Sequence, residues 1–148
     1  MIIICLFKKN KQNIIPTKRK VVTMNGTVII IDDEEDILEL LSEYLLLEDF
    51  DVVGVGNNGL KAVNLYKEYK PDFVLMDVSM PDYDGVYGLE NIKKINPDAK
   101  VIILTGNSEK TITEKLTELN ATRILSKPYP IEKLVNVMKS LKNGSHGV

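Results

Sequence analysis

Five short apolar runs alternate along this chain with segments whose apolar residues recur at helical spacing. The runs are rich in β-branched residues and fall at 27–31, 51–55, 73–76, 100–104 and 123–126. Strands that alternate with helices form a parallel sheet, and helices cover both of its faces. The sequence therefore predicts an α/β fold in which a doubly wound sheet of five parallel strands carries five helices.

The expected helices can be located from the residues that begin and end them and from their apolar periodicity. Asn58-Gly59 opens the second helix, Lys70-Pro71 closes it, and Pro130 precedes the last helix. The apolar residues at helical spacing in the first helix are Ile37, Leu40, Leu41, Tyr44 and Leu47. We also expect Leu45, Leu46 and Leu47 to pack in the core rather than to bind a partner.

Polar side chains follow four of the five runs at the point where each run ends. Asp32 and Asp33 follow the first run, Asp77 the third, Thr105 the fourth and Lys127 the fifth, after Ser126. In an open parallel sheet, residues at the carboxyl ends of the strands converge on one crevice. The sequence therefore brings together three carboxylates, a hydroxyl and an ammonium group.

This combination of groups predicts phosphoryl transfer. Two carboxylates about 4 Å apart repel by about 4 kcal/mol at an effective dielectric constant of 20, so a cation must offset their charge. Magnesium suits carboxylate oxygens and leaves a position for a phosphate oxygen. A carboxylate can then act as the nucleophile, and Lys127 and Thr105 can hold the charge on the phosphoryl oxygens. Asp77, in the middle of the group, is the expected acceptor.

Each of these residues also has a structural interpretation. The acidic run from Asp32 to Asp36 can cap the first helix and complement its dipole, and alone it favours that interpretation. Asp77 alone can be a turn residue, Thr105 a strand end and Lys127 a solvated surface residue. Their occurrence together, each behind its own strand, favours a functional site.

In this order, the residues resemble the receiver domains of two-component response regulators. Asp32-Asp33 matches the family's acidic pair, Asp77 its phosphoacceptor, Thr105 its hydroxyl residue and Lys127-Pro128-Tyr129 its lysine-proline-aromatic signature. The intervals from Asp33 to Asp77, from Asp77 to Thr105 and from Thr105 to Lys127 are 44, 28 and 22 residues. The resemblance extends over residues 26–142 and implies a flavodoxin-like receiver fold with strand order 2-1-3-4-5.

The resemblance also implies roles for individual residues. Asp33 and Asp77 would hold Mg²⁺ together with the backbone carbonyl of Ser79, and Asp32 would act through a coordinated water. Asp77 would accept a phosphoryl group from a sensor histidine kinase or a histidine phosphotransfer protein. Lys127 would pair with that group, and the Lys127-Pro128 bond would be cis.

Thr105 is expected to turn inward and hydrogen-bond the phosphoryl group. This movement would alter the face formed by the fourth helix, the fifth strand and the last helix, where a downstream protein target would bind. One position departs from the family: an aromatic residue usually stands three before the lysine, and here it is Ile124.

We expect residues 26–142 to form the domain. Residues 1–25 form an apolar and then basic leader that is predicted to be disordered or not translated, since Met24 offers a later start. The leader's apolar run is too short to span a bilayer, so a weak tether to a membrane or partner is the alternative. Residues 143–148, with the single histidine His146, are expected to form a flexible tail.

Composition narrows the function classes. The net charge is −2, with 19 basic residues scattered among 21 acidic ones, which argues against direct nucleic-acid binding. The single cysteine, Cys5, excludes an intramolecular disulfide and favours the cytoplasm.

The favoured function is a single-domain response regulator that catalyses only its own phosphorylation and dephosphorylation. Since no effector domain follows Lys142, it would bind a partner or pass phosphate onward in a relay. A receiver-like interaction module without phosphorylation is the alternative. A haloacid-dehalogenase-like phosphatase is less favoured, because it needs an Asp-x-Asp pattern after the first strand and Asp32-Asp33-Glu34 does not supply one.

Overall fold

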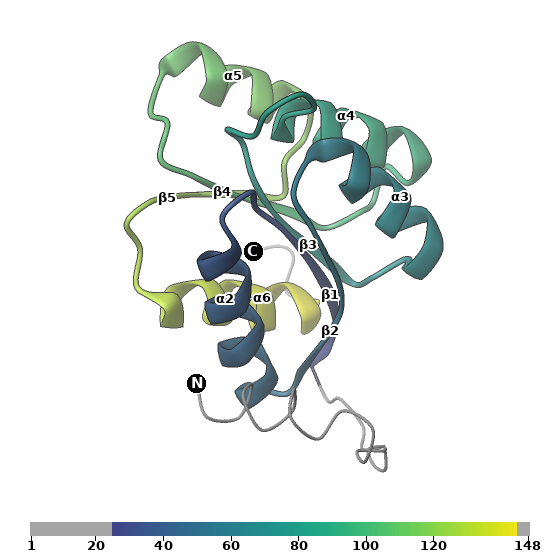
Figure 1. Ribbon diagram of the computed structural model, residues 1–148, viewed down its shortest axis with the longest axis vertical. Coiled ribbons are helices and arrows are strands. Elements are labelled where there is room, and N and C mark those ends of the chain that lie inside the picture. The colour runs from purple at the N-terminus through teal and green to yellow at the C-terminus, as the bar shows by residue number, and fades with distance from the viewer. Residues whose placement is uncertain (1–24, 145–148) are drawn as a thin grey trace.

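A computed structural model describes residues 25–144 and places five strands in one sheet (Figure 1). The strands are β1 (Gly26–Ile31), β2 (Phe50–Gly56), β3 (Phe73–Asp77), β4 (Val101–Thr105) and β5 (Arg123–Ser126). Their order is β2-β1-β3-β4-β5, and every neighbouring pair is parallel. The predicted fold and the strand order implied by the resemblance are both confirmed.

Five helices cover the two faces of the sheet. They are α2 (Glu35–Leu47), α3 (Gly59–Tyr69), α4 (Gly85–Ile95), α5 (Lys110–Glu118) and α6 (Ile131–Lys142). Helices α2 and α6 lie on one face, and α3, α4 and α5 lie on the other (Figure 1). None of these helices is long and apolar enough to cross a membrane. The predicted leader and tail, with Cys5 and His146, lie outside the described residues except for Asn25, Asn143 and Gly144.

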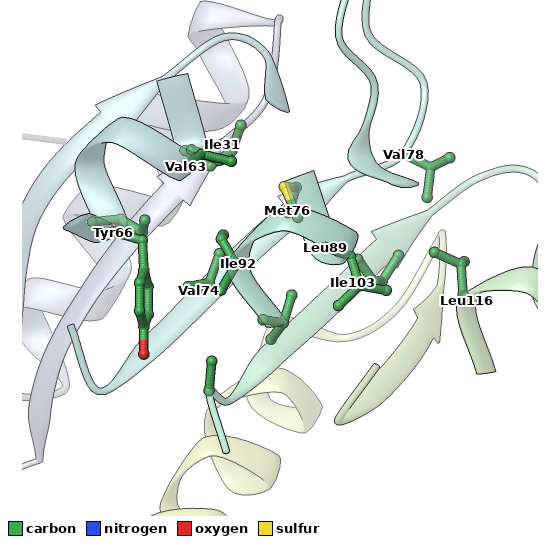
Figure 2. Packing of buried hydrophobic residues seen from close by; sticks show 14 of the residues in the cluster. Ile31, Val63, Tyr66, Val74, Met76, Val78, Leu89, Ile92, Ile103 and Leu116 are labelled. Carbon is green, nitrogen blue, oxygen red and sulfur yellow. The ribbon is translucent and has the colours of Figure 1, made fainter. Parts of the chain in front are cut away.

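The sheet separates two apolar cores. Alternate residues of a strand point to opposite faces, so Ile29, Val74 and Ile103 pack on the side of α3 to α5, and their neighbours Ile30 and Leu75 pack on the side of α2 and α6. Figure 2 shows the first core, in which strand residues meet side chains from α3, α4 and α5. Because the central strands are covered on both faces, they read as continuous apolar runs.

The predicted apolar stripe of α2 is partly wrong. Leu41 and Leu45 are buried at 3% and 0% exposure, whereas Leu40, Leu46 and Leu47 are 53%, 41% and 57% exposed. The expectation that Leu46 and Leu47 pack in the core is therefore not met. Four consecutive apolar residues at 44–47 are compatible with more than one stripe, so periodicity alone does not choose the buried face.

The turns that begin and end the helices follow the sequence signals. The Asn58 side chain accepts a hydrogen bond from the Lys61 N–H at 2.9 Å and caps α3, and Lys70 ends that helix in the left-handed region at φ 44°. The Asp84 side chain caps α4 by accepting from the Tyr87 N–H at 2.9 Å. Helix α6 begins at Ile131, directly after Pro130.

Candidate functional site

Three carboxylates meet at the carboxyl ends of β1 and β3, as the sequence predicts. Asp32 and Asp33 directly follow β1, and Asp77 is the last residue of β3, the neighbouring strand. One oxygen from each of the three carboxylates lies within 4.8 Å of the others. Asp32 and Asp77 are buried, whereas Asp33 is exposed.

Asp77 is held by the turn that follows β3. Its Oδ1 accepts a hydrogen bond from the Val78 N–H at 2.8 Å, and the Val78 carbonyl accepts one from the Gly85 N–H at 2.9 Å. A Cβ atom at Gly85 would collide with the backbone carbonyl oxygen of Asp77, so only glycine permits this close approach. Gly85 is not among the predicted site residues, although a glycine at the start of a helix is a usable signal.

Burial raises the pKa of the Asp77 carboxyl above its ordinary value. Lys127 opposes this shift in pKa, and the negative charges of Asp32 and Asp33 add to it. The ionised form of Asp77 is therefore held at an energetic cost.

Lys127 is the cation that faces the carboxylates. Its ammonium nitrogen lies 3.6 Å from Asp32 Oδ2 and 3.7 Å from Asp77 Oδ1. The Lys127 N–H donates to the Thr105 carbonyl at 2.8 Å, which extends the pairing of β4 and β5, and the Lys127-Pro128 bond is cis. Among the described residues, Lys127 is the cation paired with these carboxylates, and its single positive charge does not balance their three negative charges.

Asp32 also takes part in the turn before α2. Its Oδ1 accepts from the Glu34 N–H at 2.9 Å, while its Oδ2 faces Lys127. The N-cap residue of α2 is Glu34, whose side chain makes no capping bond. Asp32 therefore stabilises the turn before α2 with one oxygen without capping the helix, and its other oxygen lies in the crevice.

The hydroxyl of Thr105 faces its own loop in this structure. Thr105 is buried at the end of β4, and its Oγ1 accepts from the Asn107 N–H at 2.9 Å. Ser79 lies exposed two residues after Asp77, and Ile124 is partly buried against the core on the side of α3 to α5.

Tyr129, predicted only as the aromatic residue of the lysine-proline-aromatic signature, is a further neighbour of the crevice. It packs against the core on the side of α2 and α6. Burial, together with the charges of Asp32 and Asp77, raises the pKa of its phenol to about 12. The phenol therefore stays protonated at physiological pH and adds no charge to the crevice.

The donor set of the crevice fits a divalent cation. Asp32, Asp33 and Asp77 offer only oxygen atoms, which hard cations such as Mg²⁺ prefer. Lys127 offsets one of their three negative charges. The acidic triad is therefore consistent with a Mg²⁺ site.

Comparisons with known proteins agree with this geometry. The sequence matches the response regulator receiver domain over residues 28–139. It is 30% identical over 118 residues to the chemotaxis protein CheY of Thermotoga maritima, which covers 80% of this chain and 98% of that protein. It is 35% identical over 106 residues to CheY of Halobacterium salinarum, and this match covers 72% of this chain and 88% of that protein.

A solved structure extends the comparison. One chain of the CheX–CheY–BeF₃–Mg²⁺ complex from Borrelia burgdorferi superposes with a TM-score of 0.73 at 26% identity, covering 78% of this chain and 87% of that chain.

The chain therefore belongs to the response regulator receiver family. It is a CheY-like signalling switch of two-component systems rather than a classical enzyme, and the crevice of Asp32, Asp33 and Asp77 is its pocket for phosphorylation. Receiver domains of this family partner with histidine kinases.

Proposed function

We propose that Asp77 is the phosphoacceptor and that a sensor histidine kinase or a histidine phosphotransfer protein is the donor. The observation that carries this proposal is the position of Asp77, which is buried at the strand end between two other carboxylates and Lys127. Val78 and Lys127 both contact Oδ1, which leaves Oδ2 to attack the phosphorus. An O–P bond to Asp77 forms, and the P–N bond of phosphohistidine breaks with its electron pair kept by the imidazole.

The other residues of the crevice have supporting roles in this proposal. Asp33, Asp77 and the Ser79 carbonyl would hold Mg²⁺, with Asp32 acting through a water. The bound ion would neutralise charge on the carboxylates and on the phosphoryl oxygens. The Lys127 ammonium, already within 3.7 Å of Asp77, pairs with the transferred group.

The switch follows from a turn of the Thr105 hydroxyl toward the phosphoryl group. It would alter the face of α5, β5 and α6, where a downstream protein target binds or from which phosphate passes onward. The partly buried Ile124 occupies the position of the family's aromatic residue, so we propose that no aromatic rotation accompanies the switch. We assign no nucleic-acid partner, and we propose the cytoplasm as the compartment in which histidine kinases donate.

Phosphotransfer from a panel of autophosphorylated histidine kinases tests this proposal. We expect the label to move to this protein from a cognate kinase when Mg²⁺ is present and to stay on the kinase when EDTA removes the ion. Calorimetry is expected to show Mg²⁺ binding that Asp33→Asn weakens. Absence of Mg²⁺ binding, or of transfer from every kinase, would favour the interaction module that works without phosphorylation.

A further inference from the structure

A short chain of hydrogen bonds connects the end of β4 to the start of α5. The Asn107 N–H donates to Thr105 Oγ1 at 2.9 Å, and the same hydroxyl lies 3.4 Å from the Asn107 carbonyl. The side-chain oxygen of Asn107 accepts from the Glu109 N–H at 2.8 Å. Asn107 thus lies between the hydroxyl that the switch uses and the residue that precedes α5.

The first turn of α5 has few other attachments. Glu109 is the N-cap residue of α5 and makes no side-chain capping bond, and the buried residue of this helix, Leu116, lies two turns further on. By contrast, α4 buries Gly85, Gly88, Leu89 and Ile92, and the Asp84 side chain caps it. The start of α5 therefore depends on Asn107, on the partly buried Ile112 and on the Thr113 hydroxyl, which donates to the Glu109 carbonyl at 3.3 Å.

The loop also has room to move. An open groove of about 430 Å³ lies beside it, and Ser79, Met80, Asn107 and Ile112 are among the residues that line it. Asn107 therefore borders open space on this side rather than tightly packed side chains.

Ile124, on the neighbouring strand β5, is poorly suited to carry the signal. Ile124 pairs with Ile103 in the sheet and packs against the core. Its β-branched side chain is restricted about χ1, so it is a poor element for reporting a movement of Thr105 by rotation.

We propose that Asn107 is a positioning residue that couples the Thr105 hydroxyl to the first turn of α5 and stabilises the resting state of the switch. This inference rests on the proposed phosphorylation of Asp77. When the hydroxyl turns to the phosphoryl group, the Asn107 N–H loses its acceptor and the turn that holds Glu109 loosens. The hydrogen bonds of Asn107 therefore favour the resting state, and their loss shifts the equilibrium toward the active state.

Binding of beryllofluoride with Mg²⁺ to three variants tests the coupling. Asn107→Ala removes the acceptor for Glu109, and we expect the apparent affinity to rise about three- to tenfold, the factor that corresponds to one net hydrogen bond. Asn107→Ser keeps an uncharged side-chain oxygen and is expected to stay near wild type. Asn58→Ala is the matched control, because it removes a cap bond of similar length at the start of α3 without touching Thr105.

Amide hydrogen exchange supplies a readout that a merely structural role would not move. In wild type saturated with beryllofluoride, we expect the Asn107 amide to exchange faster than in the resting protein, while the Lys61 amide is unchanged.

Two results would overturn the coupling while Asp77 remains the acceptor: equal affinities for wild type and Asn107→Ala, or an Asn107 amide that stays protected at saturation. A wild type that binds no beryllofluoride, or an Asp77→Ala variant that binds it equally well, would overturn the proposed function and the coupling with it.

Discussion

Strand β3 has an aspartate at each end, and the two carboxylates have opposite surroundings. Asp72, directly before β3, accepts hydrogen bonds from the Thr27 N–H at 2.9 Å and from the Thr27 hydroxyl at 3.3 Å, which ties β3 to β1. Asp77, the last residue of β3, lies beside two other carboxylates and a single lysine. Neutral donors satisfy the first carboxylate, whereas crowding and burial penalise the second.

The same contrast holds for the two ends of the sheet. At the amino end, the Asn96 amide donates to the Tyr66 hydroxyl at 3.0 Å, and the Val101 N–H donates to the Thr122 hydroxyl at 2.9 Å. At the carboxyl end, like charges are held together by the strands that carry them. One end of the sheet therefore contributes stability, and the other keeps an unfavourable arrangement that a ligand can relieve.

Phosphorylation is expected to distinguish the two aspartates most strongly, because only Asp77 should accept the phosphoryl group. With acetyl phosphate and Mg²⁺, we expect mass spectrometry to find a phosphoryl adduct on wild type and on Asp72→Ala, and none on Asp77→Ala. The reason is that only Asp77 lies in the crevice with Lys127. Equal modification of the two variants would remove Asp77 as the acceptor.

The next prediction concerns the close backbone approach that holds the end of β3 in place. Gly85→Ala puts a Cβ against the Asp77 carbonyl oxygen, and we expect the free energy of unfolding to fall by about 2–3 kcal/mol. Gly106→Ala is the control, because a Cβ there meets nothing within 4 Å, and it is expected to change stability by less than about 0.5 kcal/mol. Urea denaturation measures both, and equal effects would contradict the close approach at Gly85.

Replacing each aspartate by asparagine is expected to change the free energy of unfolding by a smaller amount, and in opposite directions at the two ends of β3. Without divalent ions at pH 7 and low salt, we expect Asp77→Asn to raise the free energy of unfolding by on the order of 1 kcal/mol, because it relieves repulsion and burial of charge. Asp72→Asn is expected to lower it by about 0.5–1 kcal/mol, because it weakens bonds to Thr27.

The pH dependence of this effect follows from the raised pKa of Asp77. When a carboxyl has a higher pKa in the folded state than in the unfolded state, it lowers the free energy of unfolding as the pH rises from the unfolded pKa through the folded pKa. The gain in Asp77→Asn is therefore absent well below the unfolded pKa of the carboxyl, where both states are protonated, and it grows as the pH rises through the higher folded pKa. Urea denaturation across this range measures it, and a gain that does not vary with pH would contradict the assigned cause.

The smallest expected effect concerns the chain ends. We propose that residues 26–142 are the folding unit, so deletion of residues 1–23 or of 143–148 is expected to leave thermal stability and phosphorylation unchanged. Thermal denaturation and the acetyl phosphate reaction check both deletions. An insoluble product would show that the leader contributes to the fold.

The sequence predicted the fold because the apolar runs of the strands and the helical spacing of apolar residues between them are both clear. The central strands are buried on both faces and read as unbroken apolar runs, and Asn58, Lys70 and Pro130 mark helix ends by their local chemistry. The predicted positions of Asp32, Asp77 and Lys127 at the strand ends were then enough to predict that these residues lie close together.

Other features depend on tertiary contacts that the sequence does not encode locally. Periodicity did not show that Leu40 and Leu47 are exposed on α2, because several apolar stripes fit the same run. The need for glycine at position 85 arises from the backbone of Asp77, which meets it only in the folded chain. The loop-facing orientation of the Thr105 hydroxyl likewise depends on Asn107.

The backbone of Thr105 limits how far the proposed switch can move at its origin. Its carbonyl accepts the Lys127 N–H at 2.8 Å and keeps the residue within the sheet. In the proposed switch, the triggering event would therefore be a torsion about a single side-chain bond, with no strand to break and re-form. Such a trigger would reset as soon as the phosphoryl group leaves, whether by hydrolysis or by transfer onward, and no slow refolding would prolong the signal.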